Sequence, residues 1–225
     1  MTTFQQSFDV RVRRQLPDKA IFWPTAIGYG DQPQNGDSTK FPGLTAIKAR
    51  RKAVPVAPLA EFVNAARNAQ DRILILDEYL FKPPEGTFQI RVEEVLSWFP
   101  VSLEAGDVRL LTASTGNSDL DNDLSKRFTE RATQINRAGL FDTRRHVIQV
   151  RFTLKTNFPY VHDRFAIIDD ELWHFGATVG GLHEHVNAVT RGWAADDHNA
   201  PDFFETAWTG DPDMGHSFSK PTRQR

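Results

Sequence analysis

The sequence contains no cysteine among its 225 residues. This absence excludes disulfides, thiolate metal sites and a cysteine nucleophile, and it fits a reducing cytosol. No apolar run approaches the roughly 18 residues of a membrane-spanning helix, and the first residues do not follow the pattern of a signal peptide. We therefore expect a cytoplasmic protein that does not contact a membrane.

Net charge is also nearly absent, with a formal value of −2 at pH 7. Such a balance does not by itself indicate a polyanionic partner. The distribution is uneven, because Lys and Arg outnumber Asp and Glu in residues 1–55, whereas Arg164 and Arg191 are the only basic residues from 156 to 219. The two parts could pair with each other, the basic part could contact phosphates, and an ordinary solvated surface explains the pattern equally well.

Hydrophobic periodicity indicates alternating strands and helices. Apolar residues recur at helical spacing in four segments, 58–69, 88–99, 119–138 and 201–208. Strand-like apolar runs occupy six segments, 72–77, 107–112, 146–154, 160–169, 172–175 and 186–193. This order predicts an α/β fold. A turn at Asp169-Asp170 would join two neighbouring strands, so we expect a mixed β-sheet flanked by helices.

These segments divide the chain into three parts. Residues 1–57 are expected to form an irregular, basic N-terminal extension, with a short strand-like run at 8–12 and a loop rich in Gly, Pro, Asp and Asn at 28–43. Residues 58–210 form the α/β domain. Residues 211–225 form a polar tail.

The segment 160–169 carries the most informative side chains, in the pattern H-x-R-x-x-x-x-D. On a strand, His162 and Arg164 would lie on the same face because side chains alternate. An imidazole can attack phosphorus or protonate a leaving oxygen, and a neighbouring cation can hold the other phosphate oxygens. The pair therefore suits a phosphate ester, although a histidine and an arginine on one strand can also be purely structural.

The region 162–176 resembles the motif H-x-K-x4-D-x6-G-S-x-N of the phospholipase D superfamily. Three positions match this motif, namely His162, Asp169 and Gly176. The order of the preceding elements also resembles one half of that fold, over about 58–210, and the motif occurs once. The chain is most similar to short, single-motif members of the family in which H-D-R-F replaces H-x-K.

The resemblance implies a mechanism. Two histidines face each other across a twofold axis; one attacks phosphorus and forms a phosphohistidine, and the other protonates the leaving oxygen. Neither a metal nor a cofactor takes part, and the motif aspartate, here Asp169, supports the local structure. A single motif then implies a homodimer in which each subunit contributes His162. Because the chain is short and has no recognisable membrane-binding surface, the expected substrate is DNA or RNA, and the expected activity is that of a nuclease.

Several positions depart from the family motif. Arg164 stands in place of Lys, which keeps the charge but changes its geometry. Ala177 replaces the motif Ser, with Thr178 next to it, and Val179 replaces the motif Asn. An expected hydrogen bond to phosphate is therefore lost, with Thr178 as the nearest possible support.

A second departure concerns the acidic residue that usually orients the histidine. Val186 occupies its position, and Glu184 lies two residues earlier, where it could take over this role. Losing one such group typically costs about 10²–10³ in rate. An alternative function is therefore a catalytically degenerate binding or assembly module, with further protein subunits, in a larger nucleic-acid complex of a defence or mobile-element system.

Two other patterns are weaker. His183-Glu184-His185 resembles a small metal-binding cluster, but no third ligand with a telling spacing accompanies the two histidines, and we expect a polar loop and no metal. The basic run Arg50-Arg51-Lys52 could contact nucleic acid; a solvated linker or a contact with the acidic C-terminal part are the alternatives.

Overall fold

The computed structural model describes residues 15–26, 28–29, 40–53, 56–83, 86–139 and 145–215. The helices are α1 (Leu44–Arg50), α2 (Ala60–Arg67), α3 (Phe88–Ser97), α4 (Ser118–Ala138), α5 (Leu154–Asn157) and α6 (Ala200–Thr209). The strands are β1 (Ala20–Phe22), β2 (Arg72–Leu76), β3 (Asp107–Leu111), β4 (Val147–Arg151), β5 (Arg164–Ile168), β6 (Glu171–Phe175) and β7 (Val189–Ala194).

The strands form one seven-stranded sheet in the order β1-β7-β6-β5-β2-β3-β4. Strands β2, β3 and β4 are parallel to one another, whereas β5, β6, β7 and β1 pair antiparallel. The parallel connections contain α3 and α4, as βαβ crossovers require. The predicted mixed α/β fold is therefore confirmed.

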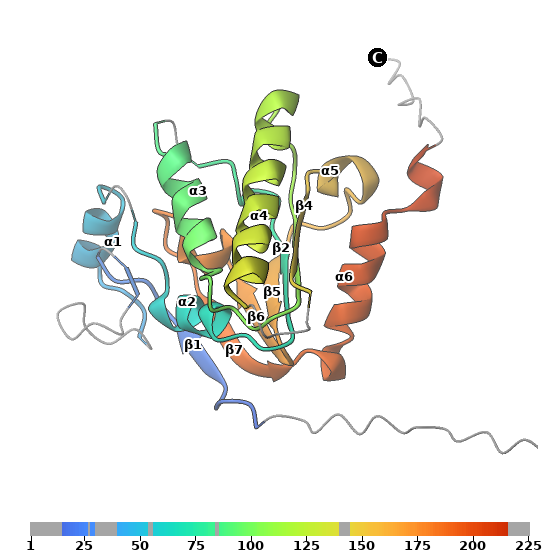
Figure 1. Ribbon diagram of the computed structural model, residues 1–225. Coiled ribbons are helices and arrows are strands. Elements are labelled where there is room, and N and C mark those ends of the chain that lie inside the picture. Colours follow the sequence, from blue (N-terminus) through green and yellow to red (C-terminus); the bar gives the residue numbers. More distant parts are fainter. Residues whose placement is uncertain are drawn as a thin grey trace, which may run out of the picture.

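Each face of the sheet has its own hydrophobic core, because alternate side chains of β2 point to opposite sides. Ile73 and Ile75 pack with α2, α3 and α4. Leu74 and Leu76 pack with α5 and α6. Figure 1 shows α3 and α4 standing in front of the sheet and α6 at its side.

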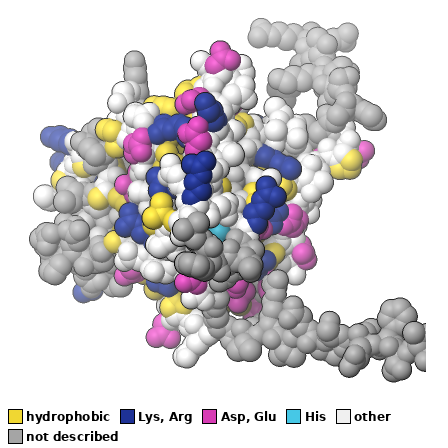
Figure 2. Space-filling model, in the orientation of Figure 1, with side chains coloured by type: hydrophobic (Ala, Val, Ile, Leu, Met, Phe, Trp, Pro, Cys, Tyr) yellow, Lys and Arg dark blue, Asp and Glu magenta, His cyan; other side chains and the backbone are white. Residues whose placement is uncertain are grey.

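Charges are mixed on the face formed by α3 and α4. Figure 2 shows Lys and Arg side chains interspersed with Asp and Glu on this face, without a dominant patch of one sign. The ion pair between Arg127 of α4 and Glu93 of α3 belongs to this surface, at 2.5 Å. Within the described ranges, no helix is long and apolar enough to span a bilayer.

Several predicted boundaries were wrong. The strand expected over 146–154 ends at Arg151, and Leu154 begins α5. Residues 1–57 were expected to be irregular, but β1 adds to the sheet beside β7, and α1 covers 44–50. The strand-like run at 8–12 and most of the loop at 28–43 lie outside the described residues.

Candidate active site

The candidate site lies at one edge of the sheet, where the antiparallel pairing brings distant segments together. Leu76, the last residue of β2, is opposite Phe165 of β5. Arg164, the first residue of β5, is opposite Phe175, the last residue of β6. The segments after β2 and β6 therefore meet the segment that precedes β5, and this segment contains His162.

His162 lies in the loop before β5 and not on the strand, because β5 begins at Arg164. The expectation that strand alternation sets the orientation of both side chains was therefore wrong. The side chain of His162 is 87% exposed, and its Nδ1 lies 3.5 Å from Oε1 of Glu78. A carboxylate beside Nδ1 favours a proton on that nitrogen and leaves the lone pair of Nε2 free.

Glu78 is a buried carboxylate two residues after β2. Its Oε2 forms an ion pair with Nζ of Lys155, and its Oε1 lies 3.8 Å from a terminal guanidinium nitrogen of Arg164. Burial raises the pKa of Glu78, but the hydrogen bond and charge of Lys155, and then those of His162, outweigh burial and hold the pKa below its usual value. Glu78 is therefore an ionised group that three cationic or basic side chains share.

Lys155, in α5, also fixes the backbone next to the histidine. Its Nζ donates a hydrogen bond of 3.2 Å to the carbonyl oxygen of Val161. Val161 immediately precedes His162 and is itself buried. Lys155 thus ties the loop that carries His162 to the carboxylate that contacts its ring.

Arg164 places a second cation beside the same carboxylates. Its Nε lies 3.5 Å from Oδ1 of Asp77, and its guanidinium lies over the ring of Tyr79, 4.8 Å from the centroid. The side chain also lines a hollow of about 300 Å³, together with Thr178 and Glu184. The guanidinium is therefore held by Asp77 and Tyr79 while it borders a space open to a ligand.

Asp77 is fully buried and connects β2 to the segment after β6. It accepts hydrogen bonds of 2.8 Å from the backbone N–H groups of Tyr79 and Val179. Burial raises the pKa of Asp77 to about 6, although these hydrogen bonds and the charges of Arg164 and Arg91 lower it. The bond from Val179 holds the turn that contains Thr178 against the end of β2, and the bond from Tyr79 is local to the segment after β2.

The other two motif residues have structural contacts. Asp169 adopts a left-handed backbone conformation with φ of +53°, and its carboxylate accepts hydrogen bonds from the N–H groups of Gln70, at 3.0 Å, and Asp71, at 2.7 Å. Gly176 packs against the backbone of the segment before β7, where an added Cβ would lie 3.3 Å from the carbonyl oxygen of Ala188. Neither residue contacts His162 through these interactions.

Glu184 was predicted to orient the histidine, but the carboxylate that lies against His162 is that of Glu78. Glu184 instead lies 3.5 Å from Nε2 of His185. His183, Glu184 and His185 lie in the loop before β7, and their ligand-type atoms are within 4.8 Å of one another, so Glu184 is the third group that spacing alone did not reveal. Burial lowers the pKa of His183; the charge of Glu184 opposes this shift, and His185, Arg91 and Arg164 add to it. The positive charges of Arg91 and Arg164 also oppose the binding of a metal ion.

The basic run does not act as a unit. Arg50 is fully buried, and its guanidinium donates hydrogen bonds to the carbonyl oxygens of Gly28, at 3.0 Å, and His183, at 2.7 Å. Arg50 is therefore not part of an exposed phosphate-binding surface, because its guanidinium is buried and donates its hydrogen bonds to backbone carbonyl oxygens. Arg51 and Lys52 are exposed at the end of α1.

Two important residues were missed by the sequence analysis, Glu78 and Lys155. A signal existed for Glu78, because Asp77 and Glu78 directly follow an apolar strand, and ligand sites of α/β sheets lie beyond such strand ends. Lys155 gave no comparable signal, because the segment 146–154 was taken as a continuous strand.

Comparisons with known proteins do not establish a family. No family model and no curated protein matches the chain. Similar solved structures include TrmBL2, an archaeal chromatin protein described as showing a novel mode of DNA binding, with 10% identity, a TM-score of 0.35 and coverage of 67% of this chain and 47% of that one. Another is phosphatidylserine synthase from Haemophilus influenzae Rd KW20, with 15% identity, a TM-score of 0.40 and coverage of 65% of this chain and 33% of that one. This chain thus spans about half and about a third of their lengths.

Proposed function

We propose that this chain is a phosphodiesterase of the phospholipase D type that cleaves nucleic acid at a site completed by a second copy of the chain. The observation that carries the proposal is the arrangement around Glu78. The exposed imidazole of His162 lies beside the ionised, buried carboxylate of Glu78. Lys155 and Arg164 lie against the same carboxylate. The arrangement leaves one imidazole nitrogen free beside a fixed cation.

His162 is the nucleophile in this mechanism. Its Nε2 attacks phosphorus, a P–N bond forms, and the ester P–O bond breaks toward the leaving oxygen. Glu78 stabilises the positive charge that the ring gains, because the carboxylate lies beside Nδ1. In the second step, water attacks phosphorus, the P–N bond breaks, and the electron pair returns to Nε2.

Arg164 stabilises the charge that develops on the phosphate oxygens. The guanidinium borders the hollow near Thr178 and lies over the ring of Tyr79, which lines the same hollow. Lys155 acts as a positioning residue. It forms an ion pair with the ionised Glu78, and it holds the loop before β5 through a hydrogen bond to Val161.

The exposure of His162 supports a site shared between two copies. A nucleophile that is 87% exposed lacks the low-dielectric surroundings in which charge stabilisation is strong. In a symmetric dimer, His162 of a second copy would protonate the leaving oxygen and later take a proton from the attacking water, and each copy would exclude water from the other.

The proposal is tested by cleavage of single- and double-stranded DNA and RNA in the presence of EDTA. Wild-type protein should cleave at least one of these substrates, and His162→Ala should abolish the cleavage while the circular dichroism spectrum stays unchanged. His198→Ala, which removes another exposed histidine, is the matched control and should keep full activity. Equal activity of His162→Ala and wild type would refute the mechanism.

A second candidate function follows from two apolar positions. Ala177 and Val179 occupy the places of the motif Ser and Asn, and both are buried, so neither contributes a polar group to a phosphate. A nucleic-acid-binding or assembly module without turnover would tolerate this loss. Binding of an oligonucleotide without cleavage, at the same affinity in wild type and His162→Ala, would favour this alternative.

A further inference from the structure

Two neighbouring hollows with different chemistry share a wall at the candidate site. The first, of about 300 Å³, is bordered by Arg164, Lys82 and Thr178. The second has a volume of about 370 Å³. Arg91, His183 and Glu184 line both, so the two spaces are adjacent.

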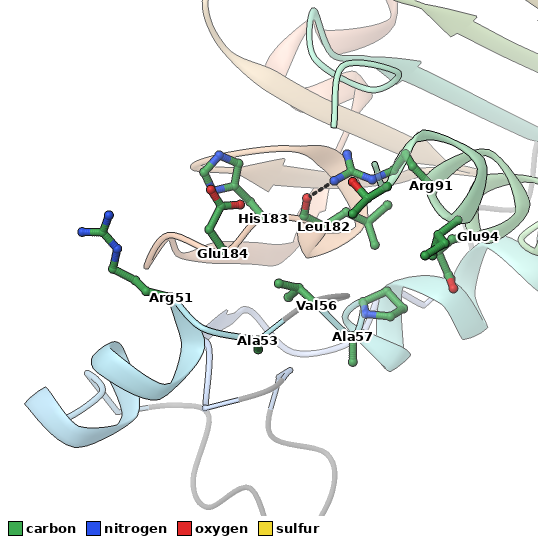
Figure 3. A pocket seen from close by; sticks show the side chains of 12 residues that line it. Arg51, Ala53, Val56, Ala57, Arg91, Glu94, Leu182, His183 and Glu184 are labelled. Atoms are coloured by element: carbon green, nitrogen blue, oxygen red, sulfur yellow. Dashed lines mark hydrogen bonds between the residues drawn. The ribbon is translucent and has the colours of Figure 1, made fainter. Parts of the chain in front are cut away.

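The second hollow is largely apolar. Val56, Pro58, Ile90 and Leu182 form its walls, and Thr87, Glu94 and Arg51 supply polar groups around them. Figure 3 shows His183 and Glu184 at one end and Glu94 at the other, with Val56 and Ala57 on the side facing α2. Apolar walls with a few convergent polar groups are typical of small-molecule sites, which range from about 300 to 1,000 Å³.

The wall between the hollows is fixed. Arg91 donates a hydrogen bond of 2.5 Å to the carbonyl oxygen of Leu182, as the dashed line in Figure 3 marks. A second bond of 3.5 Å reaches the carbonyl oxygen of Leu80. A preset shape lowers the cost of ordering a ligand.

We infer that the second hollow receives the base of a nucleotide whose phosphate lies in the first hollow beside Arg164. This inference rests on the proposed function and names its substrate class as single-stranded nucleic acid. An enzyme that seats a base in a pocket must take that base out of a duplex, at a cost that a single strand avoids.

A nucleobase fits this hollow better than an acyl chain. The faces of a base are apolar and would contact Ile90 and Leu182, whereas its edges carry donors and acceptors for charged groups such as Arg51 and Glu94. An acyl chain has no group to pair with them, and burying polar groups against it is unfavourable.

Ile90→Trp tests the inference, because Ile90 is 49% exposed and an indole there would fill the hollow without disturbing the core. Val101→Trp is the matched control, since Val101 is 51% exposed and is not among the residues that line the hollow. The probes are single-stranded oligothymidylate and an abasic oligomer of the same length, measured for binding by fluorescence anisotropy and for cleavage in EDTA.

Wild type and Val101→Trp should bind and cleave oligothymidylate about tenfold better than the abasic oligomer, because the abasic oligomer buries none of the apolar wall of the hollow. Ile90→Trp should lose most of this preference and keep its activity on the abasic oligomer. Equal binding of the two oligomers by wild type, or an undiminished preference in Ile90→Trp, would overturn the inference.

The readouts separate this inference from the proposed function. Cleavage of both oligomers without a base preference refutes the base site alone. A base preference in binding that Ile90→Trp removes, without any cleavage, supports the base site and refutes the phosphodiesterase. Micelles of a short-chain phosphatidylcholine serve as the lipid probe, and cleavage of this lipid that Ile90→Trp abolishes, with no binding of oligothymidylate, would assign the hollow to an acyl chain instead.

Discussion

At the scale of single residues, the chemistry depends on which carboxylate contacts the histidine. Glu78 approaches Nδ1 of His162 from a buried position, whereas Glu184 pairs with His185. A buried carboxylate that is ionised acts more strongly on the ring than an exposed one, because water screens its charge less. In the proposed mechanism, Glu78 therefore takes the orienting role that the sequence suggested for Glu184.

Substitution of Glu78 by Gln should lower kcat/KM for phosphodiester cleavage by about 10²- to 10³-fold, the usual effect of losing one charge-stabilising group. The amide keeps the shape of the side chain but leaves Lys155 and Arg164 without its charge. Steady-state cleavage kinetics measure the effect, and Glu184→Gln is the control. A larger loss in Glu184→Gln than in Glu78→Gln would reverse the assignment.

Asp77 should make stability depend on pH. Its pKa is about 6 when folded and close to 4 when unfolded, so between these values the folded state retains a proton that the unfolded state loses. Stability from this group is present below pH 4 and is lost as pH rises through 6, by up to roughly 3 kcal/mol at about 1.4 kcal/mol per pKa unit. Asp77→Asn should remove this dependence.

Urea unfolding at pH 4 and pH 7 provides the measurement for Asp77. The free energy of unfolding of wild type, minus that of Asp77→Asn, should be smaller at pH 7 than at pH 4. Because the comparison uses the change with pH, it is independent of any hydrogen bond that the amide fails to make to Tyr79 or Val179. A difference that is constant or rises with pH would contradict the account.

At the scale of elements, the turn between β5 and β6 is held by Asp169. Its carboxylate bonds the backbone just before β2, and its left-handed conformation is one that Asp and Asn tolerate better than Ala. Asp169→Ala should therefore reduce the free energy of unfolding by about 1 to 3 kcal/mol. Chemical denaturation measures this loss, with Asp170→Ala as the neighbouring control, and an equal effect of the two substitutions would contradict the structural role.

Most elements could be predicted from the sequence, because the spacing of apolar residues within each segment distinguishes a strand from a helix. The buried β2 appears as a continuous apolar run, and α4 has apolar residues at helical spacing. The junction at β4 and α5 was missed, since Phe152 and Leu154 continue the apolar pattern while the chain changes from strand to helix.

The candidate site was predicted only in part. His162 and Arg164 were identified by their motif, but the contact of His162 with Glu78 depends on the antiparallel pairing of β5 with β2. Glu78 and His162 lie far apart in the sequence, so the sequence alone does not reveal their contact. Arg50 shows the opposite problem, because a basic run in the sequence does not reveal that one of its members is buried.

At the scale of the whole molecule, one chain supplies a single copy of the His162 site. The proposal therefore predicts a homodimer in solution, with twice the 25.5 kDa mass of the chain. Light scattering combined with size-exclusion chromatography measures the mass, and His162→Ala should remain dimeric because its exposed side chain adds little to the fold. A strict monomer that still cleaves phosphodiesters would contradict the shared site.

The most direct test is to trap the covalent intermediate. A phosphate-labelled oligonucleotide is mixed with protein in EDTA, the reaction is stopped with denaturant at alkaline pH, where a phosphohistidine persists, and the labelled peptide is identified by mass spectrometry. The account predicts that the label is attached to His162 and is absent from His162→Ala and from unreacted protein. Cleavage that proceeds at the wild-type rate with no label on His162, or with the label on another residue, would contradict it.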